Sequence, residues 1–263
     1  MLTETILDRL PVWLLYGGTV LLLLAASELG FRLGKRRRAN MSDGEKSPAN
    51  AMMGSTLGLL AFMLAFTFGM SSSRFDARKQ LVLEDASAIL RTYERVQFLP
   101  EPQRTESNRL LREYVALRIR IPTRESLEEM QETVMRSEAI QEALWKQAVT
   151  LADRPNAILA GLMTSLAEIT DLQMKRVRAA AQNRIPSTIV FALYGIAFLG
   201  LATMGYGAGL AGSRATIPVV VLILAFSAIV VLIVDLERPR QQLFEITQEP
   251  MMDVARRIQL IQP

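Results

Sequence analysis

The stretch AMMGSTLGLLAFMLAFTFGMSSS, residues 51–73, contains 23 residues and no charged side chain. An α-helix rises about 1.5 Å per residue, so this length crosses the roughly 30 Å hydrocarbon core of a bilayer. The chain continues into RFDARKQLVLEDASAILRTYERV, residues 74–96, without a proline or glycine that would end the helix. The sequence therefore predicts a membrane-spanning helix that leads directly into a charged amphipathic helix.

The composition supports a membrane protein and excludes several kinds of chemistry. Of the 263 residues, 50% are hydrophobic, and many are concentrated in long uncharged blocks. The chain has no Cys and no His, which excludes disulfides and removes the commonest metal ligand and general base. The net charge is only +4, and basic residues are interleaved with acidic ones except at residues 35–38. We therefore expect no metal, no cofactor and no nucleic-acid partner.

The first uncharged block, residues 10–27, predicts another membrane helix. It is followed by Glu28 and by the basic run at residues 35–38. A cleaved signal peptide is the alternative interpretation. However, Asp8 precedes the block and the basic cluster follows it, which is the reverse of the charge order in a signal peptide. We therefore favour a retained first membrane helix.

Two further uncharged blocks follow the polar middle of the chain. The block between Arg184 and Arg214 predicts the third membrane helix, and residues 215–234 predict the fourth. The glycine-rich tract GYGAGLAGS, residues 205–213, lies between them. It lacks the lysine and the preceding strand of a phosphate-binding loop, so we expect it to be a flexible turn.

Residues 74–184 have the pattern of a helical bundle. This segment contains a single glycine, and prolines divide it into four amphipathic parts. Apolar residues recur at steps of three and four, as at Val82, Ala86, Ile89 and Tyr93, which places them on one helix face. The adjacent acids Glu84-Asp85 and Glu128-Glu129 point about 100° apart on a helix, so we expect solvated faces rather than an acid–base pair.

We therefore predict an all-α integral membrane protein with four transmembrane helices and a helical domain inserted between the second and third. The expected segments follow one another along the chain. They are an N-terminal tail with the first helix (1–34), a polar basic loop (35–50), the second helix (51–73), the helical domain (74–184), the third helix (185–210), the fourth helix (215–235) and a C-terminal tail (236–263).

The charge pattern leaves the orientation in the membrane open. Ten Lys and Arg residues lie near helix ends on the side of the helical domain, and six lie on the side of the two short loops. This total favours a cytoplasmic helical domain with both termini on the same side. The densest basic cluster, residues 35–38, lies on the loop side and favours the opposite orientation.

Six short fragments carry a family resemblance. They are LAFTF (64–68), SRFDAR (73–78), LPEP (99–102), LREYV (111–115), NRIP (183–186) and LIVDLERP (232–239). Together with the order of two helices, a helical domain and two more helices, they resemble the bestrophin-like membrane proteins of bacteria, a family of unknown function. The resemblance covers most of the chain and implies a multi-pass protein of the bacterial inner membrane.

A more distant resemblance is to the bestrophin anion channels. Phe62 and Phe66 are four residues apart, and Arg74-Phe75 follows at a matching interval. In those channels such phenylalanines from five subunits form a hydrophobic neck, which makes Phe62, Phe66, Gly58 and Met70 the pore candidates here. Arg74, Arg78 and Lys79 are the corresponding basic candidates at the pore mouth.

The sequence also departs from the bestrophin pattern. Gly58 occupies a position where the family has a further apolar neck residue. Pro239 is followed by Arg240 instead of Phe, and the acidic run of the calcium-activated members is missing. We therefore transfer no calcium site. The alternative role for Phe62 and Phe66 is simple packing against lipid or a neighbouring helix.

Two functions of different classes fit the sequence. The first is a homo-oligomeric, anion-permeable channel, pentameric by analogy, whose pore is lined by the second membrane helix. The GxxxG pair Gly54 and Gly58 would allow close helix packing. The second is a membrane-anchored scaffold or sensor, in which residues 74–184 bind a protein partner and the membrane helices only anchor them. Because no nucleophile or nucleotide-binding motif occurs, we expect neither a catalytic residue nor an enzyme.

Overall fold

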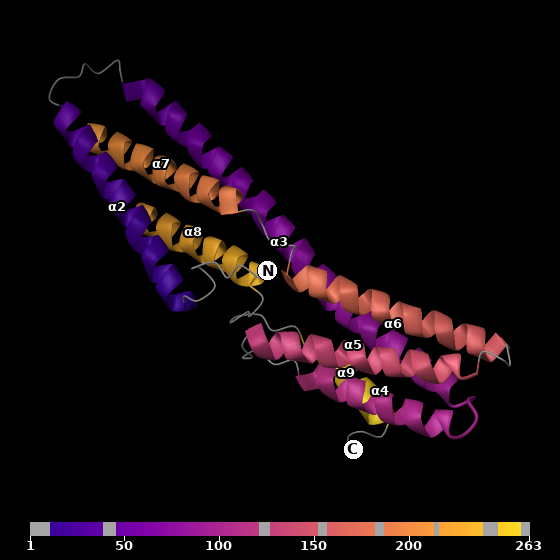
Figure 1. Ribbon diagram of the computed structural model, residues 1–263. Helices are drawn as coiled ribbons and strands as arrows, with labels where there is room; N and C mark the ends of the chain where they lie inside the picture. The colour runs from indigo at the N-terminus through magenta and orange to yellow at the C-terminus, as the bar shows by residue number, and fades with distance from the viewer. Residues whose placement is uncertain are drawn as a thin grey trace. The chain divides into compact units, whose positions relative to one another are not determined.

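The computed structural model describes residues 11–38, 46–120, 127–151, 157–181, 187–212, 216–238 and 247–258. These residues form α-helices and no strand, which confirms the all-α prediction. The helices are α2 (Val12–Arg38), α3 (Lys46–Val96), α4 (Gln103–Arg120), α5 (Leu127–Val149), α6 (Ala157–Ala181), α7 (Ser187–Ala211), α8 (Thr216–Glu237) and α9 (Glu249–Arg257) (Figure 1).

Four of the helices that the structure describes are long and apolar enough to cross a membrane. They are Val12–Arg38, Gly54–Val96, Thr188–Ala211 and Ile217–Glu237. The chain divides into two compact units. We call Met1–Phe75 with Arg184–Phe244 the membrane unit, and Asp76–Asn183 with Glu245–Pro263 the helical unit.

The closest packing in the membrane unit is between α2 and α7. A Cβ added at Gly30 would lie 2.7 Å from the carbonyl carbon of Ala202, and one added at Gly209 would lie 2.7 Å from the backbone nitrogen of Lys35. Real Cβ atoms do not approach backbone atoms so closely, so only glycine permits these contacts. Gly34 and Gly205 are confined in the same way. The two helices therefore meet backbone to backbone, as small residues allow in membranes.

The end of α7 differs from the sequence-based expectation. The tract at residues 205–213 was predicted to be a flexible turn, but α7 continues to Ala211. Gly212 then adopts a positive φ of 72°, and its N–H donates to the carbonyl of Ala208 at 3.0 Å. The turn prediction is wrong because these glycines serve tight helix packing, and the helix ends only at Gly212, in the left-handed conformation common at helix ends.

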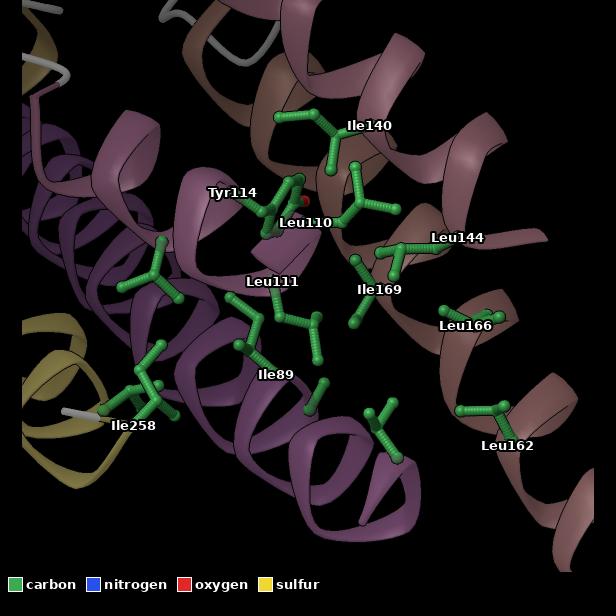
Figure 2. Close-up of a cluster of buried hydrophobic side chains, with 14 of the residues drawn as sticks. Ile89, Leu110, Leu111, Tyr114, Ile140, Leu144, Leu162, Leu166, Ile169 and Ile258 are labelled. Atoms are coloured by element: carbon green, nitrogen blue, oxygen red, sulfur yellow. The ribbon is translucent and has the colours of Figure 1, made fainter. Parts of the chain in front are cut away.

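The core of the helical unit combines side chains from α3, α4, α5 and α6. Figure 2 shows Ile89, Leu111, Leu144 and Leu166 converging on one another from these four helices. The three- and four-residue apolar stripes predicted from sequence supply this core, since Val82, Ala86 and the labelled residues are buried. The helical-bundle packing expected for the stripes is therefore present.

Helix α9 belongs to the same core. Its residues Met251, Val254 and Ala255 are buried, as is Ile258 immediately after it. The spacing of three, one and three places these side chains on one face of a short helix that starts with Pro250 in its first turn. Residues 236–263 were expected to form a C-terminal tail, and within that tail residues 251–258 contribute to the core of the helical unit.

Candidate functional site: an exposed face of helix α3

The part of α3 within the membrane unit buries one face. Leu60, Leu64, Thr67 and Ser71 are buried, at steps of four, three and four. The contact with α7 is ordinary van der Waals packing, since a Cβ added at Gly200 would lie 3.5 Å from both Leu60 and Thr56. Side chains, rather than backbones, therefore hold α3 against α7.

The opposite face of α3 carries the two phenylalanines predicted to form a neck. Phe62 is 65% exposed and Phe66 is 57% exposed. Their rings stack with centroids 6.4 Å apart and planes inclined by 17°. A helix brings residues four apart onto the same side, so the two rings form one apolar surface. Gly54 and Gly58 are also exposed, and a Cβ added to either would meet no atom within 4 Å.

Met70 extends this face toward the end of the membrane unit. It is half-buried and lines a shallow groove. The groove is formed by Ala65, Phe66, Gly69, Met70, Ser73 and Arg74. The structure therefore places Phe62, Phe66 and Met70 along one side of α3, on a surface that no other described helix of the unit covers.

The basic candidates are not grouped as one free cluster. Arg74 is only 28% exposed, and its Nη1 lies 3.3 Å from Oε2 of Glu237 at the end of α8. At about 100° per residue, Arg74 points about 100° away from the mean direction of Phe62 and Phe66. Arg78 is half-buried and Lys79 is exposed, both on the part of α3 that belongs to the helical unit. An acidic partner therefore offsets the charge of Arg74.

A second polar centre lies inside the helical unit, and sequence reasoning missed it. Asp85 of α3 is fully buried, and its carboxylate meets Arg118 of α4 and Arg176 of α6. Nε of Arg118 is 3.5 Å from Oδ2 of Asp85. The expectation of a solvated face holds for Glu84 but is wrong for Asp85. The sequence signal that could have revealed the burial of Asp85 was its position within the apolar stripe from Val82 to Ile89.

Neutral polar groups extend this centre. The hydroxyl of Tyr114 accepts hydrogen bonds from Arg118 at 2.5 Å and Gln141 at 3.0 Å, and donates to Oε1 of Gln173 at 3.1 Å. Burial raises the pKa of the Tyr114 hydroxyl. Burial also lowers the pKa of Arg176, although the Asp85 carboxylate opposes this shift. One network therefore joins α3, α4, α5 and α6.

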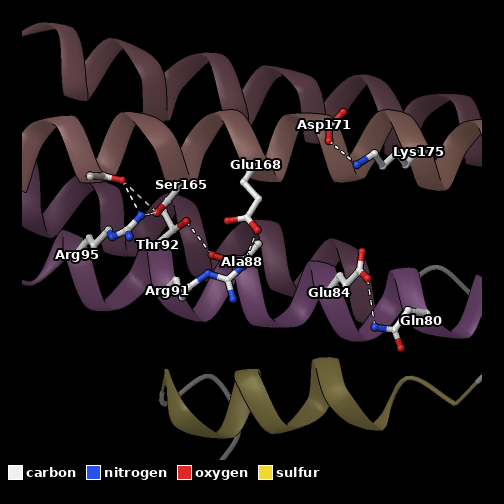
Figure 3. A network of polar contacts seen from close by, with 11 residues as sticks. Gln80, Glu84, Ala88, Arg91, Thr92, Arg95, Ser165, Glu168, Asp171 and Lys175 are labelled. Carbon is white, nitrogen blue, oxygen red and sulfur yellow. Dashed lines mark hydrogen bonds and ion pairs between the residues drawn. The ribbon is translucent and has the colours of Figure 1, made fainter.

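The surface of the helical unit carries an ion pair and hydrogen bonds between α3 and α6. Figure 3 shows Arg91 reaching Glu168, with 2.6 Å between Nη2 and Oε1. Nearby, Arg95 donates to the carbonyl oxygen of Gly161 at 2.6 Å. Exposed pairs of this kind contribute little to stability. Among the residues that the structure describes, no group of three His, Cys, Asp or Glu could hold a metal ion.

These features define a class of protein: a multi-pass membrane protein with four long apolar helices and a polar helical unit. The model of the Bestrophin-like domain matches residues 21–251, so the chain belongs to the Bestrophin-like family. The family resemblance stated from the sequence fragments is thereby confirmed.

The fold is similar to solved membrane proteins. A bacterial bestrophin homologue from Klebsiella pneumoniae has a TM-score of 0.63 at 15% identity, over 94% of this chain and 97% of that chain. Another structure, described only as that of a membrane protein, has a TM-score of 0.63 at 13% identity, over 95% of this chain and 97% of that chain. At such identities the likeness concerns the fold alone. No curated protein matches the chain significantly.

Proposed function

We propose that this chain is the subunit of a homo-oligomeric, bestrophin-like ion channel whose pore is lined by α3. In this proposal the helical unit is inserted between the second and third membrane helices. The protein lies in the bacterial inner membrane, with the helical unit and both termini in the cytoplasm.

The observation that carries the proposal is the exposed, stacked pair Phe62 and Phe66 on an uncovered face of a spanning helix. Around a symmetry axis, copies of this pair would form successive apolar rings. Such a constriction can block ions by excluding water, and it opens when the rings move apart or are removed. The neighbouring glycines Gly54 and Gly58 would let another helix approach closely in the assembly.

The permeant class in this proposal is an anion, as in the bestrophin channels that the sequence resembles. Lys79 is an exposed cation on α3 that would attract it. The pairing of Arg74 with Glu237 weakens the contribution of Arg74 to such attraction. Chloride and potassium flux should therefore be measured side by side.

The test is ion flux from liposomes that contain the purified protein. The double variant Phe62→Ala/Phe66→Ala should conduct several-fold faster than the wild type, because it removes the proposed constriction. The matched control is Phe191→Ala/Leu199→Ala, which removes two exposed apolar side chains of α7 and should leave the flux unchanged.

Two results would contradict the proposal. Equal flux from both double variants would mean that Phe62 and Phe66 contact only lipid. No flux from any folded variant, together with a monomeric mass in native mass spectrometry, would exclude a channel. That outcome would favour the membrane-anchored scaffold, and a partner of the helical unit should then co-purify with the full chain.

A further inference from the structure

The C-terminal end of α2 carries a basic cluster that the proposed channel does not use. Lys35, Arg36, Arg37 and Arg38 form the last turn of this helix, and all four are exposed. The nearby acid Glu28 is already paired with Arg32 at 2.9 Å. Within the described part of the chain, no acidic side chain forms an ion pair with the four cations.

The four cations do not face the same way. Gly34 and Arg38 lie on the side of α2 that meets α7, and the guanidinium of Arg38 lies directly against Gly212. A positive charge there offsets the partial negative charge at the C-terminal end of α7. Arg38 therefore has a role within the protein. At about 100° per residue, Arg36 lies about 160° around α2 from Gly34, whereas Arg37 lies about 60° from Gly34 and about 40° from Leu33, and both side chains are exposed.

Arg36 and Arg37 share their side of α2 with exposed leucines. Leu29 is 53% exposed and Leu33 is 58% exposed, and the steps of three and four place Arg36 and Arg37 next along this face. Arg36 lies 24 residues after Val12, which is about 36 Å along a helix. This distance places the two guanidiniums just beyond a hydrocarbon core of about 30 Å.

We propose that Arg36 and Arg37 bind the phosphate headgroup of an anionic phospholipid, whose acyl chain lies along Leu33 and Leu29. Arginine guanidinium matches the geometry of a phosphate, and clusters of cations beside a membrane helix attract anionic lipids. The apolar residues directly below the cations favour a lipid over a free anion or a soluble protein.

The test compares lipid retention by the full-length protein in native mass spectrometry. The protein is released from detergent micelles that contain phosphatidylglycerol or, separately, phosphatidylcholine. Arg36→Gln/Arg37→Gln should weaken phosphatidylglycerol binding by about fivefold for each arginine, or about 25-fold in total, and leave phosphatidylcholine binding unchanged. Arg36→Lys/Arg37→Lys should retain most of the binding, which also shows that the site remains folded.

The control is Arg112→Gln/Arg257→Gln, which removes two exposed cations from the helical unit and should bind phosphatidylglycerol like the wild type. Equal loss in this control would show that only overall charge matters and would overturn the proposal. Equal binding of the two lipids by the wild type would also overturn it. Displacement of the lipid by inorganic phosphate would reassign Arg36 and Arg37 to a simple anion site.

Discussion

Replacing Asp85 by Asn should be the most damaging conservative substitution in the helical unit. The change keeps the size of the side chain, so it creates no cavity. It removes the carboxylate that lies between two guanidiniums, those of Arg118, which is 4% exposed, and Arg176, which is 14% exposed. Leaving buried charge without its partner costs about 3–5 kcal/mol, and here two like charges would remain together.

Comparison with Arg176→Gln separates the stability cost of removing the Asp85 counter-charge from the cost of losing polar contacts in general. That variant leaves Asp85 balanced by Arg118, and the lost group lies at the edge of the centre. We expect it to cost about 1.5–3 kcal/mol, the contribution of a hydrogen bond to a charged group. The asymmetry arises because the wild-type centre holds one negative and two positive charges.

The assay is urea unfolding of the full-length protein in detergent, followed by tryptophan fluorescence. Trp145 packs against the core of the helical unit, so in a Trp13→Phe background it reports on that unit. The midpoint should fall in the order wild type, Arg176→Gln, Asp85→Asn, with unchanged slopes. If Asp85→Asn were no less stable than Arg176→Gln, Asp85 would not be the counter-charge of this centre.

Two further predictions follow from named contacts. Gly34→Ala and Gly205→Ala should each lower the free energy of unfolding by about 1–3 kcal/mol, and with it the thermal midpoint, because a Cβ cannot fit between α2 and α7. The control Gly195→Ala should leave the midpoint unchanged, since a Cβ added there meets no atom within 4 Å. The raised pKa of Tyr114 means that the unfolded tyrosine ionises first, so its contribution is complete below pH about 10 and is lost as the pH rises above that value. Tyr114→Phe should flatten the fall of the thermal midpoint in this alkaline range.

The helices and most of the core could be predicted from the sequence because their signal is local. Val82, Ala86 and Ile89 lie on one face of their helix, and each uncharged block is long enough, as a helix, to cross the bilayer. Helix α9 was missed because its apolar face spans only residues 251–258, which is too short a pattern to distinguish a docked helix from a polar tail.

Glycine spacing shows where local signals are insufficient. The pairs Gly54 and Gly58, Gly30 and Gly34, and Gly205 and Gly209 all have the GxxxG spacing. Within the chain the last two pairs make the close contact, while Gly54 and Gly58 touch no other described helix. The spacing identifies a helix face that can be approached closely, but it does not identify the partner. Packing of Gly54 and Gly58 therefore stays a prediction about another copy of the chain.

The exposure of Phe62 and Phe66 likewise does not identify what covers them. In water, two exposed phenylalanine rings would be a costly apolar surface, and their exposure alone would indicate a missing partner. In a bilayer the surrounding lipid is equally apolar, so exposure has little cost and does not distinguish lipid from a pore. The distinguishing property is water: only an apolar ring that faces an aqueous path changes ion flux when it is removed. Flux from the Phe62→Ala/Phe66→Ala variant therefore tests the role of this face directly, which burial within one chain cannot do.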